Sequence, residues 1–155
     1  MFGKSVAEYL GFQKLFLALI AVVGLARLGL SLAGLPNSRV MWFSMTGVAL
    51  AGVVYYGAAV HTRGFGSYKQ LLALAFFQMT LMHLIAVLGI VVSIAGFANI
   101  YTAPEFSGPS VPTSQWTHAL AHLTIGIMAT TVLGWAIAAV VLLVTKRLAP
   151  RPAAA

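Results

Sequence analysis

The stretch from Gln70 to Gly96 constrains this chain more than any other feature, because it is almost wholly apolar and carries no charged side chain. As an α-helix rising about 1.5 Å per residue, it is long enough to cross the roughly 30 Å hydrocarbon core of a bilayer. Only 7% of the chain is charged and 61% is hydrophobic, whereas about a quarter of the residues in soluble domains are charged. The stretch therefore predicts a membrane-spanning helix.

Three further apolar stretches have the length of membrane helices. We expect helices over about 14–34, 40–60, 70–96 and 117–145. The first two connections are short, and short connections make consecutive helices antiparallel neighbours. The predicted fold is therefore all-α, a single domain over 1–155 that forms an up-down-up-down four-helix transmembrane bundle. Outside the helices we expect a short interfacial segment over 1–13, an outer Pro-rich loop over 97–116 and a disordered tail over 150–155.

The basic residues predict the orientation of the bundle. Most of them flank the N-terminus, the second connection and the C-terminus: Lys4, Lys14, Arg63, Lys69, Lys146, Arg147 and Arg151. Since cytoplasmic segments carry an excess of Lys and Arg, we expect a multi-pass protein of the inner (cytoplasmic) membrane with both termini in the cytoplasm. We therefore expect membrane lipids to surround the protein and to be its partners. Basic residues at helix ends, rather than along one polar face, also argue against nucleic acid as a partner.

Arg27 lies within the first predicted helix, where a charge costs at least roughly 2.5–3.5 kcal/mol unless it reaches water or a partner. Its long side chain can snorkel towards the outer interface. Alternatively, it binds an anion: the loop residue Glu105, a lipid phosphate, an acid on another subunit, or an acidic group of a bound cofactor. An internal charge also argues against a cleaved signal sequence, although Ser31-Leu32-Ala33 resembles a cleavage site.

Three histidines are the other candidate site residues. His118 and His122 are four residues apart, so both rings project from one face of a helix, and this spacing can bind a metal ion or present haem ligands. His83 lies near the middle of its helix, and helix lengths permit it to lie at the level of His122. The simplest alternative is that His83 hydrogen-bonds to Thr46, Thr130 or a backbone carbonyl.

Two cofactors would suit these residues. A haem b could be held between His83 and His122, with Arg27 at a propionate group. A quinone could instead accept hydrogen bonds from His83 and Arg27. We therefore predict cofactor-binding roles for His83, His122, His118 and Arg27.

Small residues at helical spacing predict where the helices approach one another, because they let backbones come close. The second predicted helix carries one such stripe, at Ser44, Gly47, Ala51 and Ala58. The fourth carries another, at Gly126, Thr130 and Gly134.

Missing residue types narrow the function. The chain has no Cys, which excludes thiol–disulfide chemistry and thiolate metal sites. It has no Asp, which excludes a Ser-His-Asp triad, and the predicted spans hold no carboxylate for coupled transport. We expect a non-catalytic membrane protein, a subunit or partner-binding component of a larger membrane complex or a homo-oligomer. The alternatives are an electron-transfer protein that binds haem b or a quinone, and a small oligomeric transporter.

Overall fold

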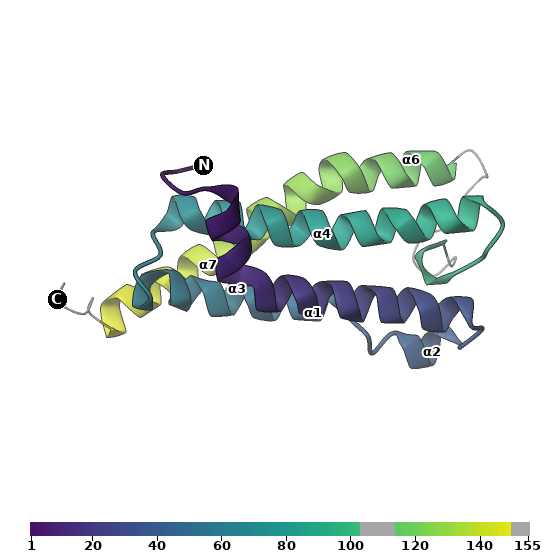
Figure 1. Ribbon diagram of the computed structural model, residues 1–155, viewed down its shortest axis with the longest axis horizontal. Helices are drawn as coiled ribbons and strands as arrows, with labels where there is room; N and C mark the ends of the chain where they lie inside the picture. Colours follow the sequence, from purple (N-terminus) through teal and green to yellow (C-terminus); the bar gives the residue numbers. More distant parts are fainter. Residues whose placement is uncertain (103–113, 150–155) are drawn as a thin grey trace.

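The computed structural model describes residues 1–102 and 114–149, and these residues form helices and no strand. Four helical segments are long and apolar enough to cross a membrane: Val6–Leu32, Asn37–Thr62, Tyr68–Ile94 and Gln115–Leu148. They pack side by side as an elongated bundle (Figure 1). The prediction of an all-α membrane bundle with four spanning helices is confirmed.

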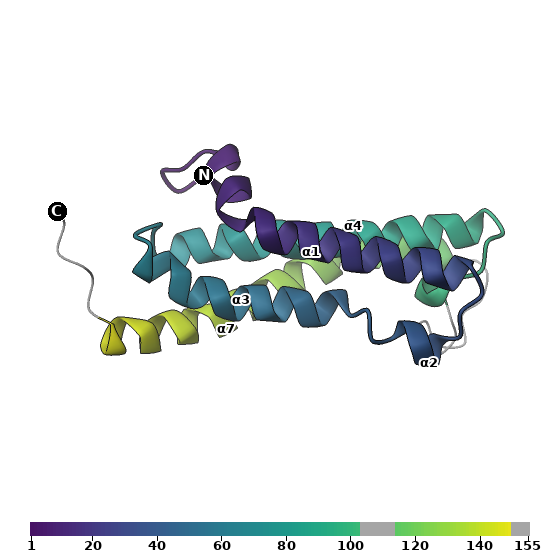
Figure 2. The same ribbon diagram turned by 60° about the horizontal axis from the view of Figure 1, so that its bottom comes forward.

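Eight helical elements make up the described part of the chain. In order they are α1 (Val6–Leu32), α2 (Asn37–Val40), α3 (Met45–Thr62), α4 (Tyr68–Ile94), the 3-10 turn η1 (Ile100–Thr102), α6 (Ser114–Ala121), the π-helical turn η2 (His122–Gly126) and α7 (Ile127–Leu148). Figures 1 and 2 show the N-terminus and the last turns of α7 at one end of the bundle, and α2 at the other. We call the latter the α2 end. Which end faces which side of a membrane stays a prediction.

The predicted boundary between an interfacial segment 1–13 and a helix starting near 14 is wrong. The helix begins at Val6, because Ser5 and Glu8 form a capping box. The Glu8 amide donates to Ser5 Oγ at 3.2 Å, and the Ser5 amide donates to Glu8 Oε2 at 2.7 Å. The first turns of α1 lie across the end of the bundle, and the rest runs along it (Figure 1).

Within the second spanning segment, the long helix α3 starts later than the predicted residue 40. Ser44 caps α3, since its hydroxyl accepts a hydrogen bond from the Gly47 amide at 3.1 Å. Residues Asn37–Val40 form the separate short helix α2. The predicted loop 97–116 contains η1 and the start of α6. The remainder of that loop, 103–113 with Glu105, and the predicted tail 150–155 lie outside the described residues.

Glycines set the closest contacts between helices. A Cβ atom on Gly57 of α3 would lie 2.7 Å from Val141 Cβ and 2.8 Å from the Ala138 carbonyl oxygen, both on α7. A Cβ on Gly134 of α7 would lie 3.1 Å from Met79 Cε. The absence of a side chain at these positions lets α7 pack closely against α3 and α4.

The predicted small-residue stripe on the fourth helix is confirmed by these contacts, but the one on the second helix is wrong. Gly47 and Ala51 are exposed. The buried face of α3 is offset from that stripe and consists of Met45, Ala49, Gly52, Val53, Tyr56, Gly57, Ala59, Val60 and His61. A helix that is apolar on all sides gives no hydropathy signal for the face that it buries. For this reason the sequence could not predict which residues of α3 face the other helices.

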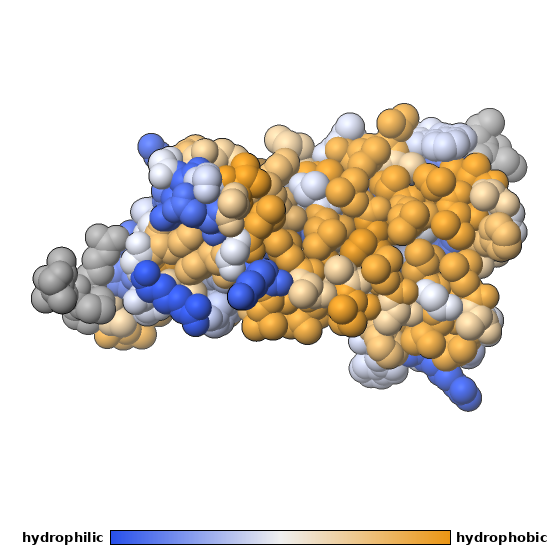
Figure 3. Space-filling view, in the orientation of Figure 1, coloured by the Kyte–Doolittle hydropathy of each residue, from blue (hydrophilic) through white to orange (hydrophobic). Residues whose placement is uncertain are grey.

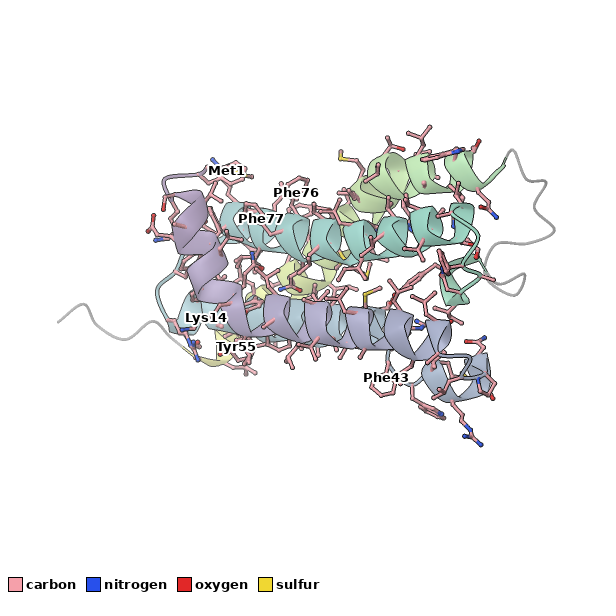
Figure 4. All side chains as sticks on the ribbon, turned by 45° about the vertical axis from the view of Figure 1, so that its right-hand side comes forward. Met1, Lys14, Phe43, Tyr55, Phe76 and Phe77 are labelled. Atoms are coloured by element: carbon pink, nitrogen blue, oxygen red, sulfur yellow. The ribbon has the colours of Figure 1, made fainter. Side chains whose placement is uncertain are left out.

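The outer surface is that of a membrane protein. A broad hydrophobic area covers most of the visible face, and hydrophilic residues gather towards the end that holds the N-terminus and around α2 (Figure 3). Lys14 and Tyr55 lie towards the former end, whereas Phe43 lies near α2 (Figure 4). Beside it, Trp42 is 82% exposed, as suits an aromatic side chain at a membrane interface. These features support the prediction of a multi-pass membrane protein. The predicted location in the inner (cytoplasmic) membrane stays a prediction.

One buried polar residue of α1 leads to a stability prediction. Gln13 is 0% exposed, and neither its amide oxygen nor its amide nitrogen has a hydrogen-bond partner among the described residues. Leaving such a group unsatisfied costs about 1–3 kcal/mol. We expect Gln13→Leu to raise the midpoint of thermal unfolding in detergent.

Gln70 provides the matched control for this substitution. Its amide donates to the Phe2 carbonyl at 2.8 Å and accepts from the Ser67 amide at 2.8 Å. Gln70→Leu should therefore lower the midpoint. A Gln13→Leu protein that unfolds below the wild type would contradict the prediction.

Candidate functional site

A pocket of about 410 Å³ lies between the helices, in the half of the bundle that is nearer to the α2 end. Its volume falls within the range of roughly 300–1,000 Å³ that is usual for small-molecule sites. All four site residues predicted from the sequence line it. The full lining is Arg27, Met45, Thr46, Met82, His83, Ala86, Ile100, Tyr101, His118, His122 and Thr130.

The three histidines form a continuous hydrogen-bonded row, which we call the histidine series. His118 Nε2 lies 3.1 Å from His122 Nε2, and His122 Nδ1 lies 2.7 Å from His83 Nδ1. His83 Nε2 then lies 3.1 Å from the hydroxyl oxygen of Thr130. The alternative in which His83 hydrogen-bonds to Thr130 is confirmed. The contact with Thr46 is not found, since its hydroxyl faces Met82 Sδ at 3.9 Å.

Thr130 fixes the direction of every hydrogen bond in the series. Its hydroxyl donates to the Gly126 carbonyl at 2.6 Å, so the oxygen must accept from His83 Nε2–H. A neutral His83 therefore accepts at Nδ1 from His122 Nδ1–H. A neutral His122 in turn accepts at Nε2 from His118 Nε2–H. This assignment, made from the hydrogen-bond network, leaves His118 Nδ1 as an acceptor for another group.

The π-helical turn η2 positions two parts of this series. It separates α6, which carries His118, from α7, which carries Thr130, and His122 is its first residue. Such turns widen a helix by one residue and occur often at functional sites. A Cβ atom on Gly126, the last residue of η2, would lie 2.8 Å from His83 Cε1. The turn and its glycine thus let the His83 ring lie directly against the fourth spanning segment.

Tyr101 is a pocket residue that the sequence analysis did not single out. The turn η1 folds back onto the bundle: the Ile100 amide donates to Ser31 Oγ at 2.9 Å, and Asn99 Nδ2 donates to the Gly89 carbonyl at 2.8 Å. The Tyr101 ring packs against Gly89, where a Cβ would overlap it. Only the aromatic ring beside a turn-forming Asn marked this position in the sequence.

The Tyr101 hydroxyl points between α1 and α3. It lies 3.5 Å from the Gly24 carbonyl and 3.9 Å from Met45 Sδ. Burial raises the pKa of Tyr101 above its ordinary value, and the positive charge of Arg27 offsets part of this increase. The phenol therefore keeps its proton at neutral pH, and its long contacts with the Gly24 carbonyl and Met45 Sδ are ones that a ligand oxygen can replace.

Arg27 is half-buried and lies on the pocket wall. Its charge acts on Tyr101, so the guanidinium group lies within electrostatic reach of the pocket. Of the anions considered for it, Glu105 falls outside the described residues. The arrangement supplies a permanent positive charge with several N–H donors next to the histidine series.

The geometry is not that of a metal centre. Among residues 1–102 and 114–149, no group of three or more His, Cys, Asp or Glu side chains is placed to hold a metal ion. In the histidine series the nitrogens of His118, His122 and His83 face one another in a row instead of converging on one point. A metal bound by His118 and His122 alone stays a prediction.

A haem between His83 and His122 would need a different spacing. Two nitrogens on opposite sides of one iron atom lie about 4 Å apart, twice a metal–nitrogen distance of about 2.0 Å. The facing nitrogens of His83 and His122 are 2.7 Å apart, and Gly126 packs against the His83 ring. The arrangement therefore favours a ligand held by hydrogen bonds at the edge of the series.

Comparison with known proteins gives no further guide, since no family model, no curated protein and no solved structure matches the chain. Function has to be inferred from the pocket itself.

Proposed function

We propose that this integral membrane protein binds a quinone-class molecule in the pocket near the α2 end. The observation that carries the proposal is the meeting of Arg27, Tyr101 and the histidine series around one pocket whose other lining residues are apolar apart from Thr46 and Thr130. A quinone has a flat ring with two oxygens that accept hydrogen bonds. Such a ligand suits a mainly apolar site with a few convergent polar groups.

The polar groups suit the ligand oxygens. Arg27 donates through a charged guanidinium group, and Tyr101 donates through a phenol that keeps its proton. Met45, Met82 and Ile100 supply apolar contact for the ring faces. Thr46, which also lines the pocket, is exposed on the outer surface of the bundle. A lipid-soluble molecule can therefore approach from the bilayer.

The test is equilibrium binding of tritiated decylubiquinone to the protein in lipid nanodiscs, with empty nanodiscs as background. We expect saturable binding to the wild type. Hydrogen bonds to charged groups contribute about 1.5–3 kcal/mol, so Arg27→Gln should weaken binding by about tenfold or more. Arg39→Gln is the matched control, because Arg39 is an exposed residue of α2 and does not line the pocket. It should bind like the wild type.

Three results would overturn the quinone proposal. The first is binding no greater than that of empty nanodiscs, and the second is the same loss of binding in both arginine variants. The third is a b-type haem band in the dithionite-reduced minus oxidised absorption spectrum of the purified protein. That band would favour the alternative of haem-based electron transfer.

Membership of a larger membrane complex or homo-oligomer is a separate proposal and is compatible with a ligand site. It rests on the composition of the chain and on its broad apolar surface (Figure 3). Cross-linking in native membranes followed by mass spectrometry tests it. The small-transporter alternative also stays a prediction.

A further inference from the structure

We propose that Lys14, Tyr55 and Arg63 bind the phosphate of an anionic phospholipid at the end of the bundle that holds the N-terminus. We call these three residues the headgroup cluster. The site is separate from the pocket near the α2 end and does not depend on the proposed function. Three observations carry it: the meeting of the three side chains, the lack of a carboxylate beside them in the described part of the chain, and the apolar surface that continues from them.

Contacts between α1 and α3 bring the headgroup cluster together. The guanidinium carbon of Arg63 lies 5.5 Å from the centre of the Tyr55 ring, and the centre of the Phe16 ring of α1 lies 5.5 Å from it as well. Lys14, two residues before Phe16, lies next to Tyr55 where α1 turns to run along the bundle (Figure 4). Lys14, Tyr55 and Arg63 are all exposed. An ammonium group, a phenol and a guanidinium group are thus accessible at one place on the outer surface.

The described residues offer these cations no carboxylate. Glu8 is the only acidic residue within 1–102 and 114–149. Its carboxylate already accepts hydrogen bonds from Lys4 Nζ at 3.2 Å and from the Ser5 amide at 2.7 Å. The headgroup cluster therefore holds two positive charges that an anion from outside the chain can balance.

The hydrogen-bonding groups suit a phosphate. Ammonium and guanidinium groups only donate hydrogen bonds, and the Tyr55 hydroxyl can also donate one. A phosphate group presents several acceptor oxygens and a negative charge, and charge-assisted hydrogen bonds of this kind are short and strong. A headgroup with a second, positive charge, such as phosphocholine, would bring that charge close to Lys14 and Arg63. The headgroup cluster therefore favours a lipid with a net negative charge.

The neighbouring surface indicates that the phosphate belongs to a lipid. From the headgroup cluster towards the α2 end, both helices expose apolar side chains, namely Leu15 and Leu19 on α1 and Val54 and Leu50 on α3. Figure 3 shows the same change along the bundle, from hydrophilic residues near the N-terminus to a broad hydrophobic area. A phospholipid has this polarity, because its phosphate lies at the membrane interface and its acyl chains extend into the hydrocarbon core. A free phosphate ion would use only the polar part.

Native mass spectrometry of the full chain in mild detergent tests the proposal. The protein is titrated with dioleoylphosphatidylglycerol or with dioleoylphosphatidylcholine, which have the same acyl chains and differ in headgroup charge. We expect the first phosphatidylglycerol molecule to bind the wild type at least about tenfold more tightly than the first phosphatidylcholine molecule, as charge-assisted hydrogen bonds would give.

Variants of the headgroup cluster should lose this preference. Lys14→Gln and Arg63→Gln should each weaken phosphatidylglycerol binding by about tenfold and leave phosphatidylcholine binding unchanged. Tyr55→Phe keeps the ring that Arg63 contacts and removes only the hydroxyl group, so it should also weaken phosphatidylglycerol binding. Arg147→Gln is the matched control, because it removes the same charge from an exposed residue in the last turn of α7. It should keep the preference.

Four results would overturn the proposal. The first is equal binding of the two lipids to the wild type. The second is an equal loss in Arg147→Gln, Lys14→Gln and Arg63→Gln, which would mean that the basic end attracts lipid without a defined site. The third is loss of phosphatidylglycerol binding in excess ammonium phosphate, which would indicate a site for free phosphate. The fourth is a dimer that Arg63→Gln abolishes, which would make this surface an interface between two copies of the chain. An unchanged size-exclusion profile shows that the variants are folded.

Discussion

Gly57→Leu should destabilise the bundle by about 3 kcal/mol, at the upper end of the usual cost of overpacking. The added side chain would start within 2.8 Å of the Ala138 carbonyl oxygen and 2.7 Å of Val141 Cβ. Neither atom is the end of a flexible side chain, so α3 and α7 would have to separate. This contact joins two of the most extensively packed helices. Equilibrium unfolding in mixed detergent micelles measures the loss.

Gly29→Leu is the matched control for this prediction. Gly29 also lies in a spanning helix, α1, but nothing lies within 4 Å of the position of its added Cβ. Substitutions at such surface positions usually change stability by less than about 0.5 kcal/mol. Equal stability of the two variants would show that Gly57 is not a point of close helix contact.

Gly126→Ala should disrupt the pocket while leaving the bundle assembled. The added methyl group would lie 2.8 Å from His83 Cε1 and 3.1 Å from the Ala121 carbonyl oxygen. The His83 ring must therefore move, which breaks its bond to His122 and its bond to Thr130. We expect at least about a tenfold loss of decylubiquinone affinity, since a lost hydrogen bond that leaves a buried partner unsatisfied costs about 1–3 kcal/mol.

A second measurement checks the same substitution without a ligand. In the wild type labelled with ¹⁵N-histidine, the imidazole chemical shifts should show His83 protonated at Nε2 and His122 protonated at Nδ1, and Gly126→Ala should remove this pattern. Gly134→Ala is the control, because its methyl group would lie 3.1 Å from Met79 Cε and 3.3 Å from Val53 Cγ2, and its three nearest contacts include no histidine. Unchanged histidine shifts in Gly126→Ala would refute the close packing at His83.

The sequence was sufficient for the spans and for four of the residues that line the pocket. Hydropathy and length predicted the four helices, and the rarity of charges and histidines in apolar helices singled out Arg27, His83, His118 and His122. Rare polar residues in an apolar helix tend to face the interior, where they find partners. It was therefore predictable that these four residues lie close together at a similar depth in the bundle. The helix lengths alone were compatible with that arrangement but did not require it.

Other features depend on contacts between segments distant in the sequence. The π-helical turn η2 is defined by the register of the fourth spanning segment, which no residue type marks. Tyr101 reaches the pocket only because η1 folds back onto Ser31 and Gly89. The predicted start of the second spanning helix was wrong for a different reason. Ser is a typical N-cap residue, but the prediction placed Ser44 inside the helix, whereas it caps α3.

The turn η2 also bears on how such a site can arise or be lost. A π-helical turn has more residues per turn than an α-helix, so it takes up one extra residue while the helices on either side keep nearly the same facing. Removing one residue from His122–Gly126 would therefore let a regular helix run from α6 into α7, with the spans and the packing of α7 nearly unchanged. The local widening that brings His122 and Gly126 to the His83 ring would be lost. A chain one residue shorter at this point would form the same bundle with an altered site, so helix length distinguishes the two more sharply than residue type does.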